Sequence, residues 1–131
     1  MVSIIKLYLS KIQWTLITIT YMLAILGSSL QPALHQKHDV VRETVHNGLH
    51  VPAYMGLTFL LVSTFQSYNT KSRVVLRAFF ISASWGWINE IVQSYVPGRT
   101  CLVSDEVLNI IGTGLSLILM KKIKWLTEDK K

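Results

Sequence analysis

Hydrophobic residues form four long blocks along this chain, separated by short segments that are richer in polar residues. The blocks span about residues 12–30, 48–65, 78–96 and 105–120. Each approaches the roughly 20 residues with which a helix crosses a lipid bilayer, and the last is the shortest. The pattern therefore predicts an all-α fold with a single domain over residues 1–131, an integral membrane bundle of four transmembrane helices.

Local sequence signals agree with these helices. Pro52 falls near the start of the second block, where its missing N–H group costs least. Pro97 and Gly98 break the chain after the third block, and Ser104 or Asp105 is expected to cap the fourth helix. The first block also has features of a signal peptide, but its apolar stretch is longer than usual, so we favour a helix that stays in the protein.

The basic residues are distributed unevenly between the two sides that four membrane crossings would create. Ten of the thirteen Lys and Arg residues fall on the side of the termini, and three fall on the other side. Because basic residues concentrate in cytoplasmic segments, both termini are expected in the cytoplasm. The ten are Lys6, Lys11, Lys71, Arg73, Arg77, Lys121, Lys122, Lys124, Lys130 and Lys131, and the three are Lys37, Arg42 and Arg99.

The composition also narrows the class of partner. Charged residues make up 15% of the chain, below the roughly 25% of soluble domains. The basic residues that give the net charge of +6 lie between the blocks and at the ends of the chain. Membrane topology requires this placement. We therefore expect a lipid bilayer as partner and no nucleic acid. Cys101 is the lone cysteine, and His35 and His38 have no fixed helical spacing. We therefore expect neither a metal site nor a cofactor.

Polar residues within and beside the blocks are predicted to meet on the outer side of the bundle. Residues three or four positions apart share one face of a helix, so each of the last three blocks carries one polar stripe. We expect the glycines within these stripes to let helix backbones approach. The stripes are His46, His50 and Tyr54 in the second block, Ser82, Gly86, Glu90 and Gln93 in the third, and Asp105, Asn109 and Gly112 in the fourth, with Arg99 in the last connection.

These polar residues form a hypothetical functional site. Glu90 would lie about 9 Å below the outer end of its helix at 1.5 Å per residue, and ionisable residues inside a membrane are costly enough to suggest a function. Glu90, Asp105 and His50 are the candidates for acid–base catalysis, and Arg99 is the natural contact for an anion. The predicted ligand-binding residues are His50, Tyr54, Glu90, Gln93, Arg99, Asp105 and Asn109.

The same polar residues resemble the signature of VanZ-like membrane proteins. The resemblance covers about residues 46–116, and the chain departs from the family where His46-Asn47 replaces the usual Asp-Lys pair, so any charge of that pair is missing or altered. The matching residues are Glu90-x-x-Gln93-x-x-x-Pro97-Gly98-Arg99 and Ser104-Asp105-x-x-x-Asn109-x-x-Gly112, together with His50 and Tyr54 in the second block.

The resemblance implies a bacterial multi-pass protein of the inner, or cytoplasmic, membrane. The family is named for a protein associated with reduced susceptibility to the glycopeptide teicoplanin, but it implies no established reaction. Three functions stay open. The first is binding of a lipid-linked envelope precursor, a glycopolymer or a glycopeptide. The second is an intramembrane enzyme that acts on a lipid-linked or glycan substrate. The third is a structural assembly protein whose polar residues only join helices. A homo-oligomer is compatible with each.

Overall fold

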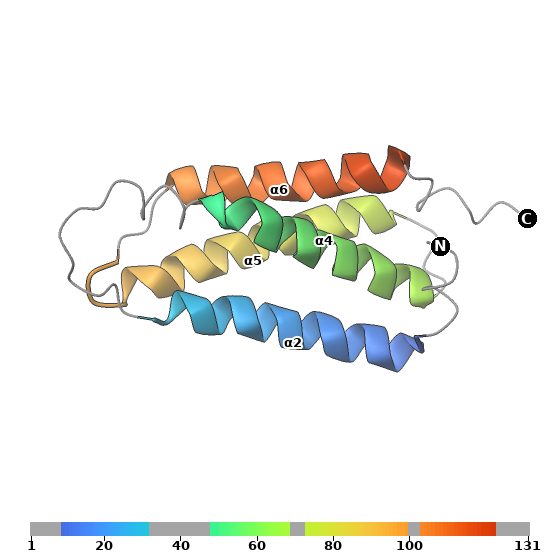
Figure 1. The fold of residues 1–131 in the computed structure, drawn as a ribbon, viewed down its shortest axis with the longest axis horizontal. Coiled ribbons are helices and arrows are strands. Elements are labelled where there is room, and N and C mark those ends of the chain that lie inside the picture. The colour runs from blue at the N-terminus through green and yellow to red at the C-terminus, as the bar shows by residue number, and fades with distance from the viewer. Residues whose placement is uncertain (1–8, 32–47, 69–72, 100–102, 123–131) are drawn as a thin grey trace, which may run out of the picture.

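The computed structural model is all-α in the part of the chain that it describes (Figure 1). This part comprises residues 9–31, 48–68, 73–99 and 103–122. Consecutive helices run in opposite directions, so the start of the first helix and the end of the last lie at the same end of the bundle (Figure 1). The helices are α2 (Lys11–Ser29), α4 (His50–Ser67), α5 (Val74–Ser94) and α6 (Val103–Lys122).

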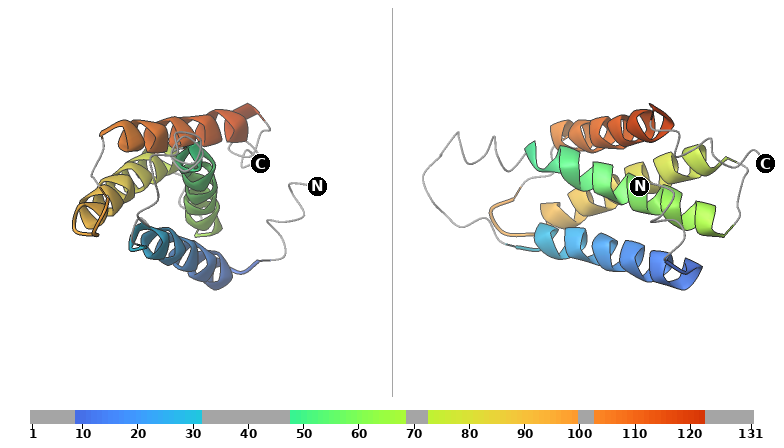
Figure 2. Two further views of the ribbon diagram at one scale, coloured as in Figure 1. Left: turned by 60° about the vertical axis from the view of Figure 1, so that its left-hand side comes forward. Right: turned by 45° about the vertical axis from the view of Figure 1, so that its right-hand side comes forward.

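The bundle has three layers. Helices α4 and α5 cross in the middle, and each packs against the three other helices. Helix α6 lies on one side of this pair and α2 on the other (Figures 1 and 2). The predicted set of four helices is therefore confirmed.

The helix ends show which local predictions hold. Ser10 caps α2, because its side chain accepts a hydrogen bond from the Gln13 backbone while the Gln13 side chain accepts one from the Ser10 backbone. The predicted break after the third block is confirmed, with Gly98 in a left-handed conformation (φ 80°) that glycine adopts without strain. The predicted cap of α6 is wrong. The helix begins at Val103, which places Ser104 and Asp105 inside its first turn.

The bundle buries polar groups and exposes hydrophobic ones. Among the described residues, 13 polar or charged side chains are buried against 9 hydrophobic ones. Large apolar side chains point outward along α2, α5 and α6, for example Leu16 on α2, Phe80 on α5 and Ile118 on α6, each more than half exposed. A bundle in water would show the opposite distribution, because exposed apolar surface is unfavourable there.

Two helices, α2 and α6, are long and apolar enough to cross a membrane. Only 17% of the apolar window of α2 and 39% of that of α6 are buried inside the bundle, so much of their apolar surface faces outward. Helices α4 and α5 carry more polar residues, but these face the interior, as Thr58, Ser82 and Asn89 do. Four membrane crossings and the orientation of the termini stay predictions.

Buried ionisable residues and most of the apolar core occupy different halves of the interior. The buried hydrophobic cluster includes Leu61 and Val62 of α4, Ala78 of α5 and Met120 of α6, toward the end where α2 begins. The buried ionisable residues lie toward the opposite end, where α4 and α6 begin and α5 finishes. The candidate site is therefore confined to one end of the bundle.

Candidate functional site

The antiparallel arrangement brings most of the predicted site residues to that end. His50 is the first residue of α4, Glu90 lies in the penultimate turn of α5, and Asp105 and Asn109 lie in the first two turns of α6. Glu90, Asp105 and Asn109 are almost completely buried, and His50 is half-buried. Convergence of these four residues was predicted from helical spacing alone, and the structure shows it.

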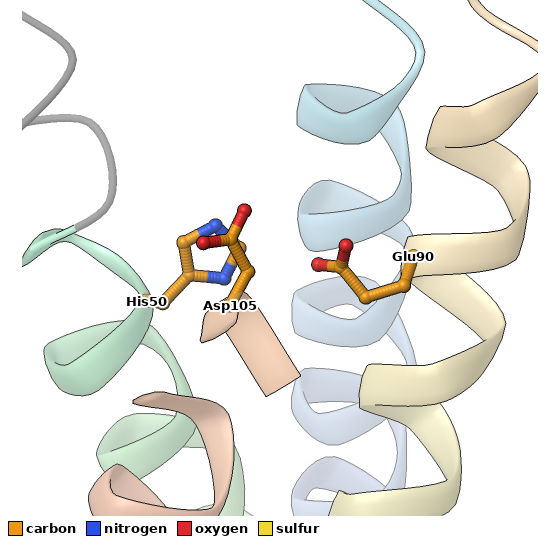
Figure 3. Close-up of side chains that lie close together, drawn as sticks. All are labelled: His50, Glu90 and Asp105. Atoms are coloured by element: carbon orange, nitrogen blue, oxygen red, sulfur yellow. The ribbon is translucent and has the colours of Figure 1, made fainter. Parts of the chain in front are cut away.

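His50, Glu90 and Asp105 form the centre of the site (Figure 3). Each comes from a different helix, and one nitrogen or oxygen of each lies within 4.8 Å of those of the other two. The side chains point toward a common space between the three helices (Figure 3). We call these three residues the triad.

A chain of hydrogen bonds holds the imidazole of the triad. The Asn109 amide nitrogen donates to Glu106 Oε2 at 3.0 Å, so the amide oxygen faces the other way. That oxygen lies 2.8 Å from His50 Nδ1. Because the amide oxygen can only accept, Nδ1 must carry the proton. In the neutral imidazole the lone pair then resides on Nε2.

Glu106 is a site residue that the sequence analysis missed. Its side chain is 2% exposed, and it lies close enough to Glu90 and His50 to interact with both electrostatically. Oε1 has no hydrogen-bond partner among the described residues. Only the stripe of Asp105 and Asn109 was predicted on this helix. Glu106 lies three residues before Asn109 and so shares a helix face with it.

Gly86 makes room for the Glu106 side chain. A Cβ atom built on Gly86 would overlap the Glu106 carboxylate and contact the Asn109 amide. The prediction that Gly86 lets backbones approach is therefore wrong, because its missing side chain accommodates a carboxylate. For Gly112 the prediction is confirmed, since a Cβ there would overlap the main chain of Val51 on α4.

Tyr54 and Gln93 belong to a second hydrogen-bond network, which joins α2, α4 and α5. The Asn89 side chain donates to Tyr54 Oη at 3.3 Å and accepts from Ser29 Oγ at 3.0 Å. Gln93 Nε2 donates to the same Ser29 hydroxyl at 3.3 Å. Ser29 and Asn89 were not predicted. This network connects helices, so it supports the triad from the side of α2.

A third polar layer lies deeper in the bundle. Thr58 Oγ1 donates to Ser82 Oγ at 3.2 Å, and the Ser82 and Thr113 hydroxyls are 2.8 Å apart. All three residues are fully buried. Each hydroxyl thus has a partner, as buried polar groups require. The layer completes a polar column that extends from the triad into the middle of the bundle.

Arg99 does not join the packed cluster. It lies in the connection between α5 and α6 and is partly exposed. Its guanidinium makes no hydrogen bond or ion pair with any residue that the structure describes. Its place is the rim of the site. The predicted stripe member His46 and the polar connection with His35 and His38 lie outside the described residues.

The site as a whole is acidic. Three carboxyl groups, those of Glu90, Asp105 and Glu106, are buried around one imidazole. Asp105 and Glu106 lie in the first turn of α6, where the positive end of the helix dipole stabilises negative charge. Such a site favours cations and hydroxyl groups, which interact with carboxylates. An anion would be held at the rim by Arg99.

Comparison with known proteins gives one match. A family model described as VanZ/LLP1 matches residues 2–125. No curated protein and no solved structure matches the chain. The matched region extends beyond the signature residues on both sides and includes all four described helices.

Proposed function

The chain belongs to the VanZ/LLP1 family, and on that basis we propose that it is a multi-pass membrane protein that binds a lipid-linked envelope precursor at its outer face. This binding would reduce susceptibility to teicoplanin-type glycopeptides, which meet such precursors outside the membrane. The observation that carries the proposal is the convergence of three buried ionisable side chains, His50, Glu90 and Asp105, from three helices.

The dimensions of the bundle support membrane insertion. The helices contain 19, 18, 21 and 20 residues. At 1.5 Å per residue they are about 27–32 Å long, which matches a hydrocarbon core of about 30 Å. The outward-facing apolar side chains described above supply the surface that lipid covers. We propose that all four helices cross the membrane.

The charge distribution supports the orientation. Ten of the thirteen basic residues fall on the side of the termini, and the positive-inside rule places that side in the cytoplasm. The triad lies at the opposite end of the bundle, and so at the outer face. Arg99 lies beside it at the level where lipid phosphates are found, which suits a phosphorylated headgroup.

The carboxylates and amides of the site suit the sugar of such a headgroup. Carboxylates accept hydrogen bonds from hydroxyl groups, and bonds to a charged acceptor are about twice as strong as neutral ones. Glu90 and Asp105 supply these acceptors, while Asn109 and Glu106 hold His50 in place. The carboxylates at the centre of the site would therefore accept hydrogen bonds from the sugar, and the guanidinium of Arg99 at the rim would bind the phosphate.

A susceptibility assay tests the proposal. Wild type, Glu90→Gln and Asp105→Asn would be expressed in a susceptible bacterium at matched membrane abundance, and teicoplanin sensitivity measured for each. Ser63→Ala is the control, because Ser63 is buried in the other half and bonds only within its own helix, to the Phe59 carbonyl. We expect protection from wild type and the control, and none from the two site variants.

The opposite pattern would favour the structural alternative. If Glu90→Gln and Asp105→Asn protect as well as wild type, the polar residues only join helices and the site assignment fails. If wild type itself gives no protection, the role in resistance is wrong. Quantification of tagged protein in the membrane separates loss of function from loss of protein.

The triad also supports an enzymatic alternative. A histidine and two carboxylates within 4.8 Å of one another can carry out general acid–base catalysis. An enzyme would leave a chemically altered lipid or glycan in the membrane, whereas a binder would not. Lipid extracts from cells with wild type and Glu90→Gln, compared by mass spectrometry, distinguish these two functions.

A further inference from the structure

The triad has the donor atoms of a metal site. Imidazole nitrogen and carboxylate oxygen are the ligands of catalytic zinc sites, which typically use three protein side chains. His50, Glu90 and Asp105 supply one nitrogen and two carboxylates from three different helices. We propose that these three residues bind a divalent transition-metal ion, with Zn²⁺ as the best-fitting probe. The sequence analysis predicted no metal site.

The distances between the ligand atoms of the triad are compatible with metal binding. Three ligand atoms within 4.8 Å of one another would each lie no more than about 2.8 Å from a central ion, compared with about 2.0–2.2 Å in zinc sites. Each side chain therefore needs to move inward by less than about 1 Å, which small rotations of its terminal groups supply. No helix has to shift.

The hydrogen bonds around His50 prepare it for coordination. Metal-binding histidines donate their second ring N–H to a carboxylate or carbonyl, which fixes the tautomer. His50 Nδ1 donates to the Asn109 side-chain oxygen at 2.8 Å, and Asn109 is held in turn by Glu106. The arrangement leaves Nε2 with the lone pair that a metal requires. Asn109 and Glu106 are thus positioning residues.

A second observation also indicates a cation. Glu106 is 2% exposed, and its Oε1 has no hydrogen-bond partner among the described residues. It lies within electrostatic range of His50 and Glu90. A buried carboxylate oxygen without a hydrogen bond is costly, and a doubly charged ion at the triad would stabilise the carboxylate through space. Three buried carboxyl groups around a single imidazole thus favour bound positive charge.

The imidazole nitrogen and the two carboxylates of the triad bind some metals more strongly than others. The triad itself supplies no thiol, and thiols would be needed for copper(I) or an iron–sulfur cluster. Mg²⁺ prefers six oxygen ligands and is bound weakly by imidazole. Mixed nitrogen and oxygen ligands suit Zn²⁺ and, more weakly, Mn²⁺. The expected order of affinity is therefore Zn²⁺, then Mn²⁺, with Mg²⁺ last.

A bound ion would also change what the site accepts. Three protein ligands leave a fourth position for an outside oxygen atom. If the proposed function holds, that oxygen belongs to the phosphate of the headgroup, between the ion and Arg99. The metal proposal itself does not depend on this ligand.

Metal analysis of the purified protein tests the proposal. The full chain, carrying an affinity tag without histidine, would be purified in detergent, stripped with a chelator and titrated with Zn²⁺, Mn²⁺ or Mg²⁺. We expect one Zn²⁺ per chain. We also expect a loss of zinc affinity of at least 100-fold in His50→Ala and Asp105→Asn, and about 10- to 100-fold in the positioning variant Asn109→Ala. Ser63→Ala should bind as wild type does.

A second measurement on wild type guards against variants that fail to fold. Cobalt(II) loaded in place of zinc should give visible absorption bands of a four- or five-coordinate ion, and zinc should abolish them. Wild type without bound zinc, or zinc uptake equal in wild type and all triad variants, overturns the proposal. Wild type that binds no zinc but still protects against teicoplanin would refute this inference alone. Zinc binding without protection would refute the proposed function alone.

Discussion

Replacing Gly112 by alanine is predicted to weaken the packing of α6 against α4. A Cβ at this position would overlap the main chain of Val51. A helix backbone cannot rotate away as the end of a side chain can, so the two helices must separate or tilt. Overpacking of this kind costs about 1–3 kcal/mol. The higher helix propensity of alanine offsets up to about 1 kcal/mol, which leaves a net loss of up to about 2 kcal/mol.

Gly114→Ala is the matched control, because it makes the same chemical change two residues along the same helix. A Cβ at Gly114 meets nothing within 4 Å. Both variants would be unfolded reversibly in mixed detergent with increasing SDS, followed by tryptophan fluorescence. We expect a lower unfolding free energy for Gly112→Ala and an unchanged or slightly higher one for Gly114→Ala. Equal stability of the two variants would refute the close approach of α4 and α6.

Three further predictions concern the site and its orientation. Gly86→Ala displaces a side chain rather than a backbone, so the unfolding free energy should change by less than about 1 kcal/mol, while zinc affinity and teicoplanin protection fall. A larger loss of stability than in Gly112→Ala would contradict this. Arg99→Gln should unfold as wild type does, because its guanidinium has no partner among the described residues, but it should protect less. Cys101, in the connection between α5 and α6, should react with a membrane-impermeant maleimide in intact cells, whereas Lys122→Cys in a Cys101→Ser background should react only after permeabilisation.

The four helices could be predicted because they follow the hydrophobic pattern of the chain. Long hydrophobic blocks with breaks such as Pro97-Gly98 define helices, and alternation of direction follows from short connections. Helical spacing then placed His50, Glu90 and Asp105 at one end. Helix boundaries were harder. The fourth helix begins before Asp105, because acidic residues stabilise a first turn as well as a cap.

The contacts within the site could not be predicted so well. Spacing shows which residues share a face of one helix, but not which faces meet. Glu106, Asn89 and Ser29 were therefore missed, although each forms a hydrogen bond within the site. The prediction that Gly86 lets helix backbones approach was wrong because a sequence does not show whether a glycine faces a backbone or a side chain. The metal site could not be predicted, because its three ligands come from three different helices. Their separations in the sequence follow no known metal-binding spacing.

The site also shows how function and stability are combined in one cluster. Asn109 joins α4 to α6 and at the same time orients His50. The network of Ser29, Asn89 and Gln93 joins α2 to α5. His50 is thus held by a bond that also joins two helices, so variants of His50, Asn109 and the network are expected to lower stability and function together. Asp105→Asn should lower function alone.

The central claim is that the polar end of the bundle is a functional site, and Asp105→Asn tests it most directly. Among the described residues, Asp105 receives only a long hydrogen bond, 3.4 Å, from the neighbouring Ser104, so the isosteric amide should leave the unfolding free energy nearly unchanged. Stability in detergent and teicoplanin protection would be measured for this variant and for wild type. The account predicts normal stability with lost protection. Full protection, or protection that falls only in proportion to stability, would contradict it.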